Sequence, residues 1–170
     1  MHYSPGQTRP AAIAFGANLD SPLQNILMAE DLIKSDRRVE FVKRSSLWLT
    51  EPVGGPPGQD WYHNQVVLYN TKMSPLELIH LLLRIESELG RIRYERWGPR
   101  LIDLDLLFLG DIELESELIS LPHPRLQERA FVLEPLQEVA PDWIHPKLGL
   151  NPTALLEKLP QNGPKTIKQS

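Results

Sequence analysis

Two Ser-Pro pairs constrain the fold most, because each marks a helix start directly after an apolar, strand-like segment. The pairs are Ser21-Pro22 and Ser74-Pro75. Serine is a favoured N-cap residue, and proline is tolerated at the first helical position. Apolar residues recur at helical spacing after both pairs, so the sequence predicts helices over residues 22–35 and 75–89.

The segments around these helices have the short apolar or alternating patterns of strands. We expect strands over residues 11–19, 39–53, 61–71 and 101–109. The order is then strand, helix, strand, strand, helix, strand. This order predicts an α+β, ferredoxin-like split βαβ fold, an antiparallel four-stranded sheet with helices packed on one face. A small hairpin or side flap over 110–122 and a short helix over 129–141 would follow, and no element is predicted beyond Gly149.

Length and composition favour one soluble domain. A chain of 170 residues is long enough to bury its own core, and we expect a flexible lead (1–10), a single domain (11–150) and a C-terminal tail (151–170). The net charge of −4 would not attract nucleic acid or an anionic membrane. The sequence has no cysteine, no signal-like start and no apolar run of membrane-spanning length. We therefore expect a cytoplasmic monomer with no membrane or nucleic-acid partner.

A pair of acidic residues interrupts the last predicted strand. Asp103 and Asp105 are two residues apart, so their side chains share one face. The neighbouring side chains should face the helix-covered core: Ile102, Leu104, Leu106 and Phe108. Taken alone, such a pair is more often two solvated aspartates than a metal site. Aspartate is a poor strand former, however, and Leu107 and Leu109 continue the same face, which favours a Mg²⁺ site.

A cluster of arginines directly precedes this pair. Between residues 91 and 100 the only acidic residue is Glu95, and the basic residues are all arginine: Arg91, Arg93, Arg96 and Arg100. Guanidinium groups match phosphate oxygens bidentately. The cluster alone could equally be a surface charge patch, but beside two metal-binding carboxylates it indicates a polyphosphate site.

Other phosphate-binding motifs are absent from the sequence. There is no G-x-x-x-x-G-K-[ST] segment and no protein-kinase signature. The tripeptide "GAN" at 16–18 is too short to be a nucleotide fingerprint, and Gly16 is interpreted as strand-end geometry. Arginines and metal would have to hold a nucleotide instead of a glycine-rich loop.

Four segments together resemble a known family. These are "FGANLDSP", "SSLWLTEPVG…WYHN", "ELGRIRYERWGPRLIDLDLLFLGD" and "LPHPRLQERAFVLEPLQEVAP". In order and spacing they resemble the 6-hydroxymethyl-7,8-dihydropterin pyrophosphokinases of folate biosynthesis, over about residues 11–146. The resemblance implies transfer of diphosphate from MgATP to the hydroxymethyl group of the pterin, with AMP as the second product.

The resemblance also implies roles for the residues that would hold MgATP. Two Mg²⁺ ions would be bound by Asp103 and Asp105, and the catalytic, phosphate-contacting arginines would be Arg91 and Arg100. Further nucleotide-site positions would be Glu86, Arg93, His123 and Arg129. Trp97 would belong to a loop that closes over the site and excludes water.

A second group of positions would bind the pterin ring. Thr50, the backbone at Val53 and the Asn64 amide would face its polar edge, and Tyr62 and Phe131 would stack on its two sides. The residues alone leave other interpretations open. Tyr62 and Phe131 could be core aromatics, and Asn64 and His123 could be ordinary hydrogen-bonded surface residues.

The sequence departs from the family pattern at two positions near these sites. Leu101 stands where a threonine is expected, so a hydroxyl contact would be lost there, and Ala17 stands where serine is usual. Neither departure affects the predicted metal or arginine positions.

A different class of function remains as an alternative. A ferredoxin-like RNA-binding module could use the arginine loop for phosphates and Trp97 or Tyr62 for stacking. The chain lacks the aromatic motif of such modules and has a negative net charge. This alternative also leaves the two aspartates without a role.

Overall fold

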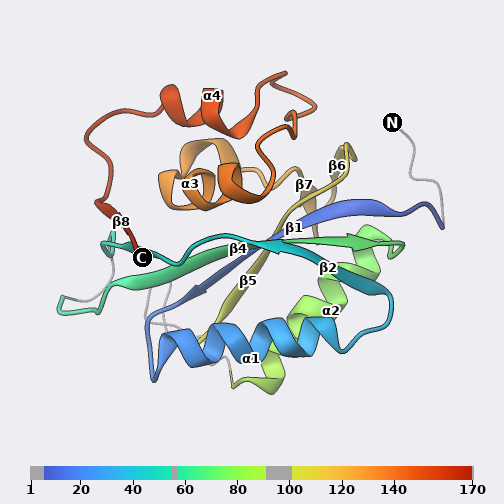
Figure 1. Cartoon of the computed structure of the whole chain (residues 1–170), viewed down its shortest axis with the longest axis horizontal. Helices are drawn as coiled ribbons and strands as arrows, with labels where there is room; N and C mark the ends of the chain where they lie inside the picture. Colours follow the sequence, from blue (N-terminus) through green and yellow to red (C-terminus); the bar gives the residue numbers. More distant parts are fainter. Residues whose placement is uncertain (1–5, 55–56, 91–100, 170) are drawn as a thin grey trace.

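The computed structural model describes residues 6–54, 57–90 and 101–169. It has a central sheet with helices on both faces, and Figure 1 shows α1 and α2 on one face and α3 and α4 on the other. The elements in chain order are β1 (Arg9–Ala17), α1 (Pro22–Lys34), β2 (Val39–Arg44), β3 (Trp48–Thr50), β4 (Tyr62–Thr71), α2 (Pro75–Glu88), β5 (Asp103–Leu109), β6 (Leu114–Glu115), β7 (Ser120–Leu121), a 3₁₀ turn (Leu126–Glu128), α3 (Ala130–Val139), α4 (Pro152–Glu157) and β8 (Thr166–Lys168).

The α+β class and the antiparallel pairing are confirmed, but the predicted number of four strands is wrong. The main sheet has six strands in the order β5-β1-β4-β3-β8, with β2 also paired to β4. Every pairing among the described strands is antiparallel. β6 and β7 form the separate hairpin that the sequence predicted. Two differences, a broken edge strand and an added C-terminal strand, account for the extra strands.

The predicted strand over 39–53 is broken into β2 and β3 at Ser45. Along β4, Arg44 pairs with Val67 and Trp48 with Asn64, so three residues face only two. The Ser45 hydroxyl accepts a hydrogen bond from the Val66 N–H at 3.0 Å, where a strand would use a backbone carbonyl. A serine side chain can compete with the backbone in this way, and the extra residue bends the edge.

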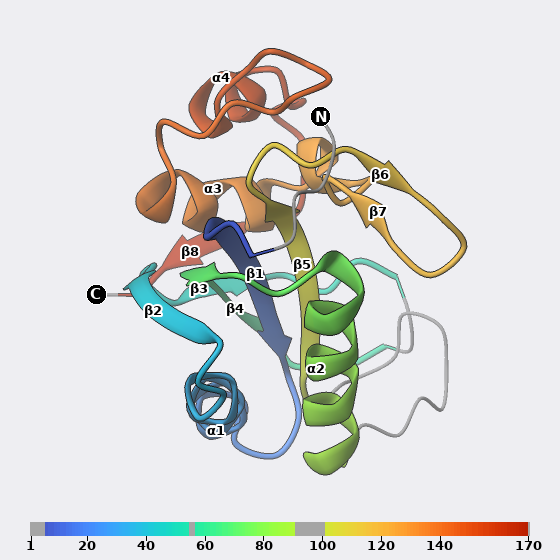
Figure 2. The ribbon, with the colours of Figure 1, turned by 90° about the vertical axis from the view of Figure 1, so that its right-hand side faces the viewer.

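The segment beyond residue 150, for which no element was predicted, contains α4 and β8. β8 extends the sheet by pairing antiparallel with β3, with Thr50 opposite Thr166. Figure 2 shows β8 beside β3, beneath α3. The C-terminal part of the chain is therefore integrated into the sheet.

Both predicted helix starts are confirmed in position, but the two serines cap differently. Ser74 forms a full capping box with Glu77, in which each side chain accepts from the other residue's backbone N–H. Ser21 precedes Pro22 at a φ of 62° and makes no side-chain cap. Among the described residues, no helix is both long and apolar enough to span a bilayer.

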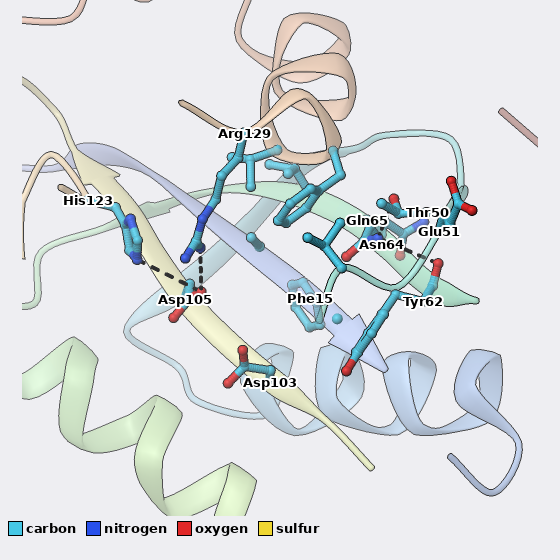
Figure 3. A pocket seen from close by; sticks show the side chains of 16 residues that line it. Phe15, Thr50, Glu51, Tyr62, Asn64, Gln65, Asp103, Asp105, His123 and Arg129 are labelled. Carbon is cyan, nitrogen blue, oxygen red and sulfur yellow. Dashed lines mark hydrogen bonds and ion pairs between the residues drawn. The ribbon is translucent and has the colours of Figure 1, made fainter. Parts of the chain in front are cut away.

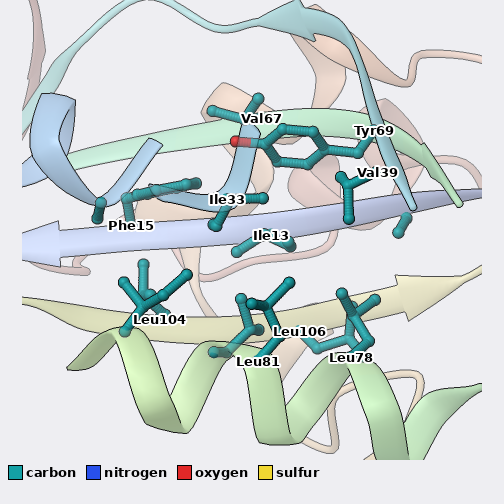
Figure 4. Close-up of a cluster of buried hydrophobic side chains, with 14 of the residues drawn as sticks. Ile13, Phe15, Ile33, Val39, Val67, Tyr69, Leu78, Leu81, Leu104 and Leu106 are labelled. Atoms are coloured by element: carbon teal, nitrogen blue, oxygen red, sulfur yellow. The ribbon is translucent and has the colours of Figure 1, made fainter. Parts of the chain in front are cut away.

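Two hydrophobic cores lie on opposite faces of the sheet. The larger packs the sheet against α1 and α2, and Figure 4 shows Ile13, Val67 and Leu106 at its centre. The smaller packs the other face against α3 and α4. Both faces of the sheet are therefore covered by packed helices.

A β-bulge in β5 changes which core its side chains enter. Ala12 pairs with Phe108 and Ile13 with Leu106, so Leu107 has no partner position on β1. Leu107 and Phe108 both pack in the α3-side core, and Leu109 returns to the α1/α2 side. The expectation that Phe108 shares a face with Leu106, and Leu109 with Leu107, is therefore wrong, because the extra residue reverses the alternation.

Candidate functional site

A cavity of about 390 Å³ opens on the α3 side of the sheet. Its lining comes from β1, β3, β4, β5 and the segments that lead into α3, and Figure 3 shows these side chains converging. The lining residues are Ala14, Phe15, Gly16, Thr50, Glu51, Val53, Tyr62, Asn64, Gln65, Val66, Asp103, Asp105, His123, Arg129, Phe131 and Val132.

The floor of the cavity is β1, where two small residues leave the space open. Gly16 pairs with Asn64 on one side and with Asp103 on the other. Ala14 lies between Val66 and Asp105 in the same way. A Cβ atom at position 16 would lie 3.4 Å from the Asn64 Oδ1, so glycine allows the amide to lie close to the sheet. The polar side chains of β4 and the acidic side chains of β5 thus lie on either side of β1, whose small residues Ala14 and Gly16 leave the space between them open.

The acidic end of the cavity confirms that Asp103 and Asp105 share a face. Both line the cavity, and they pair with neighbouring small residues of β1. Two carboxylates offer the hard oxygen ligands that Mg²⁺ prefers. Among the residues that the structure describes, no three His, Cys, Asp or Glu side chains cluster as a metal site. The pair therefore fits a Mg²⁺ ion that takes its other ligands from substrate phosphates and water.

His123 and Arg129 approach the acidic end from the opposite wall. His123 Nε2 and the Arg129 guanidinium each lie 3.9 Å from the same Asp105 oxygen, Oδ2. The β5 bulge helps to position the histidine, because the Leu107 carbonyl accepts the His123 backbone N–H at 2.8 Å. The bulge in β5 thus helps to bring His123, about twenty positions further along the chain, next to Asp105.

His123 is a neutral imidazole at physiological pH. Burial, together with the smaller effect of the positive charge of Arg129, lowers its pKa from 6.5 to about 4, against an opposing effect of Asp103. His123 and Asp105 therefore do not form an ion pair near pH 7, although their side chains lie close together. The Arg125 backbone N–H donates to His123 Nδ1 at 3.2 Å, which leaves the proton on Nε2. The histidine accordingly presents an N–H donor toward the acidic end.

Arg129 connects the acidic end to the aromatic part of the cavity. Its guanidinium carbon lies 5.8 Å from the centre of the Phe131 ring, within cation–π range. Its side chain is only 19% exposed, so its interaction with Asp105 is less screened than a surface ion pair. A phosphate between Arg129 and a metal on Asp105 would find opposite charge on both sides.

The other end of the cavity is polar and tightly hydrogen-bonded. The Asn64 amide donates to the Thr50 hydroxyl at 2.8 Å, and both residues are buried. Tyr62 lies on the same side, and its hydroxyl donates to Gln59 Oε1 at 3.4 Å. Gln59 in turn donates to the Gly54 carbonyl, so the loop after β3 is linked to the tyrosine. These contacts hold the amide and the ring in fixed orientations.

The cavity thus brings together nine of the predicted site residues. Those that line it are Thr50, Val53, Tyr62, Asn64, Asp103, Asp105, His123 and Arg129, with Phe131 as the ninth member at the start of α3. Val53 lies at the rim with 67% exposure. Four further predicted residues lie outside the described part of the chain: Arg91, Arg93, Trp97 and Arg100.

Glu86 is not among the described residues that line the cavity. Its side chain is buried against the outer edge of β5, where Oε1 accepts the Leu104 backbone N–H at 2.8 Å. This bond holds the strand between the two aspartates. The predicted contact between Glu86 and a nucleotide stays a prediction.

The floor of the cavity is the part of the site that was not predicted from the sequence. Gly16 was interpreted as strand-end geometry, whereas its place between Asn64 and Asp103 makes it part of the site. The signal was present, because "AIAFGA" alternates small with large residues, as a strand does when one face borders a cavity. Glu51 and Gln65 also line the cavity and had no sequence signal that separated them from other polar strand residues.

The fold and this site define the class: a transferase that holds a polyphosphate beside a small planar substrate. A carboxylate pair, a half-buried arginine and a neutral histidine lie at one end of the cavity, and an amide with aromatic rings lies at the other. Electrostatic positioning of phosphates is the main source of rate in this kind of chemistry.

Comparison with known proteins supports the class and defines the family. The model of the 7,8-dihydro-6-hydroxymethylpterin-pyrophosphokinase (HPPK) family matches residues 12–141. The 2-amino-4-hydroxy-6-hydroxymethyldihydropteridine pyrophosphokinase of Synechocystis sp. is 42% identical over 155 residues, covering 91% of this chain and 78% of that protein. The enzyme of the same name from Bacillus subtilis is 41% identical over 129 residues, covering 76% and 77%.

A solved structure shows the same fold. It is a Plasmodium falciparum HPPK-DHPS variant crystallised with pteroate, with a TM-score of 0.69 and 16% identity. The match covers 89% of this chain but 43% of the length of that one. The chain belongs to the 7,8-dihydro-6-hydroxymethylpterin-pyrophosphokinase family. The RNA-binding alternative has no support among these matches.

Proposed function

We propose that the chain transfers the diphosphate group of MgATP to the hydroxymethyl group of 6-hydroxymethyl-7,8-dihydropterin, a step of tetrahydrofolate biosynthesis. The observation that carries the proposal is the single cavity in which Asp103 and Asp105 lie at one end and Asn64 and Thr50 at the other. The family membership supports both substrates.

The proposed reaction forms one bond and breaks one. The pterin hydroxyl oxygen attacks the β-phosphorus of ATP, the bond from that phosphorus to the α-phosphate bridging oxygen breaks, and AMP leaves. The hydroxyl proton is released to solvent, since no described side chain is assigned as a strong general base. In-line displacement of this kind depends mainly on orientation and charge stabilisation.

The acidic end would hold the nucleotide. Asp103 and Asp105 would bind two Mg²⁺ ions, which when present neutralise the charge of the phosphates. The Arg129 guanidinium and the His123 Nε2–H lie where they could donate to phosphate oxygens. Further contacts with the nucleotide and its phosphates are proposed from the family resemblance for Glu86, Arg91, Arg93, Trp97 and Arg100.

The other end would hold the pterin. The amide of Asn64, fixed by its bond to Thr50, would present its remaining hydrogen-bonding groups to the polar edge of the ring. Tyr62 and Phe131 both line the cavity and would stack on the ring, with the Val53 backbone at the rim. We further propose that the ferredoxin-like core acts as a monomer in the cytoplasm.

One assay tests the proposal. The protein is mixed with ATP, Mg²⁺ and 6-hydroxymethyl-7,8-dihydropterin, and nucleotides are separated by chromatography. We expect AMP in an amount equal to the pterin diphosphate, and none when pterin or Mg²⁺ is omitted. Formation of ADP, or AMP formation that does not need the pterin, would contradict the proposal. Salt-sensitive RNA binding without AMP would support the alternative class instead.

A further inference from the structure

The C-terminal strand β8 is joined to β3 by a backbone ladder. The Glu51 N–H donates to the Lys165 carbonyl at 3.0 Å, and the Gln169 N–H donates to the Leu47 carbonyl at 2.8 Å. Hydrogen-bonded and non-hydrogen-bonded pairs alternate along an antiparallel ladder. The pair between them, Leu49 with Ile167, is therefore hydrogen-bonded through the Ile167 N–H.

The side chains of β8 reach a different element, α3. The Thr166 hydroxyl donates to Glu134 Oε1 at 2.8 Å. The Lys168 ammonium lies 3.3 Å from Glu138 Oε1, an oxygen that also accepts the Trp48 indole N–H at 2.9 Å. β8 thus contacts β3 through its backbone and α3 through its side chains, and Figure 2 shows it lying between the two.

These two elements carry opposite walls of the cavity. Thr50 and Glu51, at the end of β3, lie on the sheet side, and Phe131 and Val132, in the first turn of α3, lie on the other. Glu134 follows Phe131 by three residues, so it is a neighbour on the helix surface. A strand bonded to both walls sets the spacing between them.

We propose that β8 is a positioning segment for the substrate ring, in which the Ile167 N–H and the Thr166 hydroxyl hold β3 and α3 at the separation that the ring requires. This inference rests on the proposed binding of the pterin between Thr50, Asn64 and Phe131. It concerns the pterin end alone, because Asp103, Asp105 and His123 lie on β5 and the segment after β7, which make no ladder with β8.

The first test uses two substitutions at one exposed position. Ile167→Pro removes the ladder donor, and Ile167→Ala keeps it while shortening a side chain that is 50% exposed. We expect Ile167→Pro to raise the KM for the pterin about fivefold, the effect of losing one hydrogen bond, with the KM for ATP changed less than about twofold. Ile167→Ala should match the wild-type enzyme in both constants.

A second pair leaves the ladder intact. Thr166→Val removes the hydroxyl that reaches Glu134 without changing the side-chain shape. Thr166→Ser is the control that retains the hydroxyl. We expect Thr166→Val to raise the pterin KM about threefold and Thr166→Ser to return it to the wild-type value. An equal rise in both Michaelis constants, or a change in melting temperature alone, would show a purely structural strand and overturn the inference.

A variant of the pocket itself separates the two proposals. Asn64→Ala should raise the pterin KM strongly if the ring binds at this end of the cavity. If Asn64→Ala has that effect and the β8 variants do not, the positioning role is wrong and the binding site stands. If Asn64→Ala leaves the pterin KM unchanged, the proposed pterin site is wrong, and the positioning role is wrong with it.

Discussion

Asp105 has two polar neighbours at the acidic end of the cavity. The His123 imidazole and the Arg129 guanidinium both approach its Oδ2, and Asp103 lies on the same strand face. We propose that this aspartate binds metal, and its contacts with His123 and Arg129 also order the opposite wall. Its removal should therefore affect the reaction far more than the fold.

Asp105→Asn and Asp103→Asn should each lower kcat/KM by at least about 10²-fold, because the amide is a much poorer Mg²⁺ ligand than the carboxylate. Melting temperatures should stay near the wild-type value, since each substitution is isosteric and relieves like-charge repulsion. Asp111→Asn, at an exposed position just after β5, is the matched control and should keep wild-type activity. Near-normal activity of both site variants would contradict the metal assignment.

Asp36, in the turn between α1 and β2, gives a pH-dependent prediction. Its side chain accepts two hydrogen bonds from the Arg38 guanidinium, and these lower its pKa from 3.8 to about 2. The positive charge of Arg84 makes a small contribution to this lowering of the pKa, and Glu77 also contacts Arg38. A carboxyl with a lowered pKa stabilises the fold fully above its unfolded-state pKa, and the contribution is lost as the pH falls through the folded-state value.

Asp36→Asn should lower the free energy of unfolding at pH 6 by about 1 kcal/mol, allowing for the screening of the exposed Arg38 partner. The difference from wild type should begin to shrink below about pH 3.8 and should be lost near pH 2. Urea unfolding at pH 6, 4 and 3 measures it. A difference that is constant over this range would show that the charge is not responsible.

At the scale of elements, the edge strand β5 depends on a residue from a neighbouring helix. Glu86, in α2, accepts the Leu104 N–H on the side of the strand that β1 does not cover. Its side chain is buried at the outer edge of β5, which suits it to hold the strand, although the family resemblance assigns it to the nucleotide site. If Glu86 holds the strand, its removal lowers the stability of the ligand-free protein. If it only contacts the nucleotide, that stability is unchanged.

Glu86→Ala should lower the free energy of unfolding of the ligand-free protein by about 1–3 kcal/mol, the cost of leaving a buried donor unpaired. Glu86→Gln retains an acceptor oxygen and should lose less. Thermal or urea unfolding without nucleotide measures both variants. An unchanged stability of Glu86→Ala with a raised KM for ATP would favour a nucleotide contact alone.

Elements with long periodic patterns were predictable from the sequence, and short or irregular ones were not. α2 begins at Ser74 as predicted because its capping box is local to the chain. The break at Ser45 depends on a hydroxyl that replaces a backbone acceptor across the strand pair, which no local pattern shows. β8 has only three residues, and its pairing with β3 depends on the tertiary structure.

The same distinction applies to the site. The shared face of Asp103 and Asp105 follows from the two-residue period of a strand, so the residues alone predicted it. The meeting of His123 and Arg129 with that face depends on the bulge at Leu107, and it was expected only through the family resemblance. The role of Gly16 required knowledge of which strands lie on each side of it.

At the scale of the whole molecule, the cavity should couple ligand binding to stability. The proposed Mg²⁺ ions would take part of their ligands from substrate phosphates and water, so the fold of the ligand-free protein should not depend on them. EDTA should therefore abolish turnover while leaving the melting temperature of the ligand-free protein unchanged. A large drop in that temperature with EDTA would reveal a structural ion.

A non-hydrolysable ATP analogue with Mg²⁺ should raise the melting temperature. At a ligand concentration about 100 times the dissociation constant, the stabilisation is about 2.7 kcal/mol, which is several degrees for a protein of this size. Differential scanning fluorimetry measures it. Asp105→Asn should lose most of this rise, and Asp111→Asn should retain it.

The bulge at Leu107 has a consequence for how this protein can change over time. Before it, β5 presents the two acids to the ligand space, and after it the same strand inserts Phe108 against Trp143 in the smaller core. β5 therefore carries the two candidate metal ligands in its first part and a residue of the smaller core in its second part. Substitutions of the two acids would adjust the reaction with little loss of folding, whereas substitution of Phe108 would alter the packing of the smaller core, so selection can act on these positions independently.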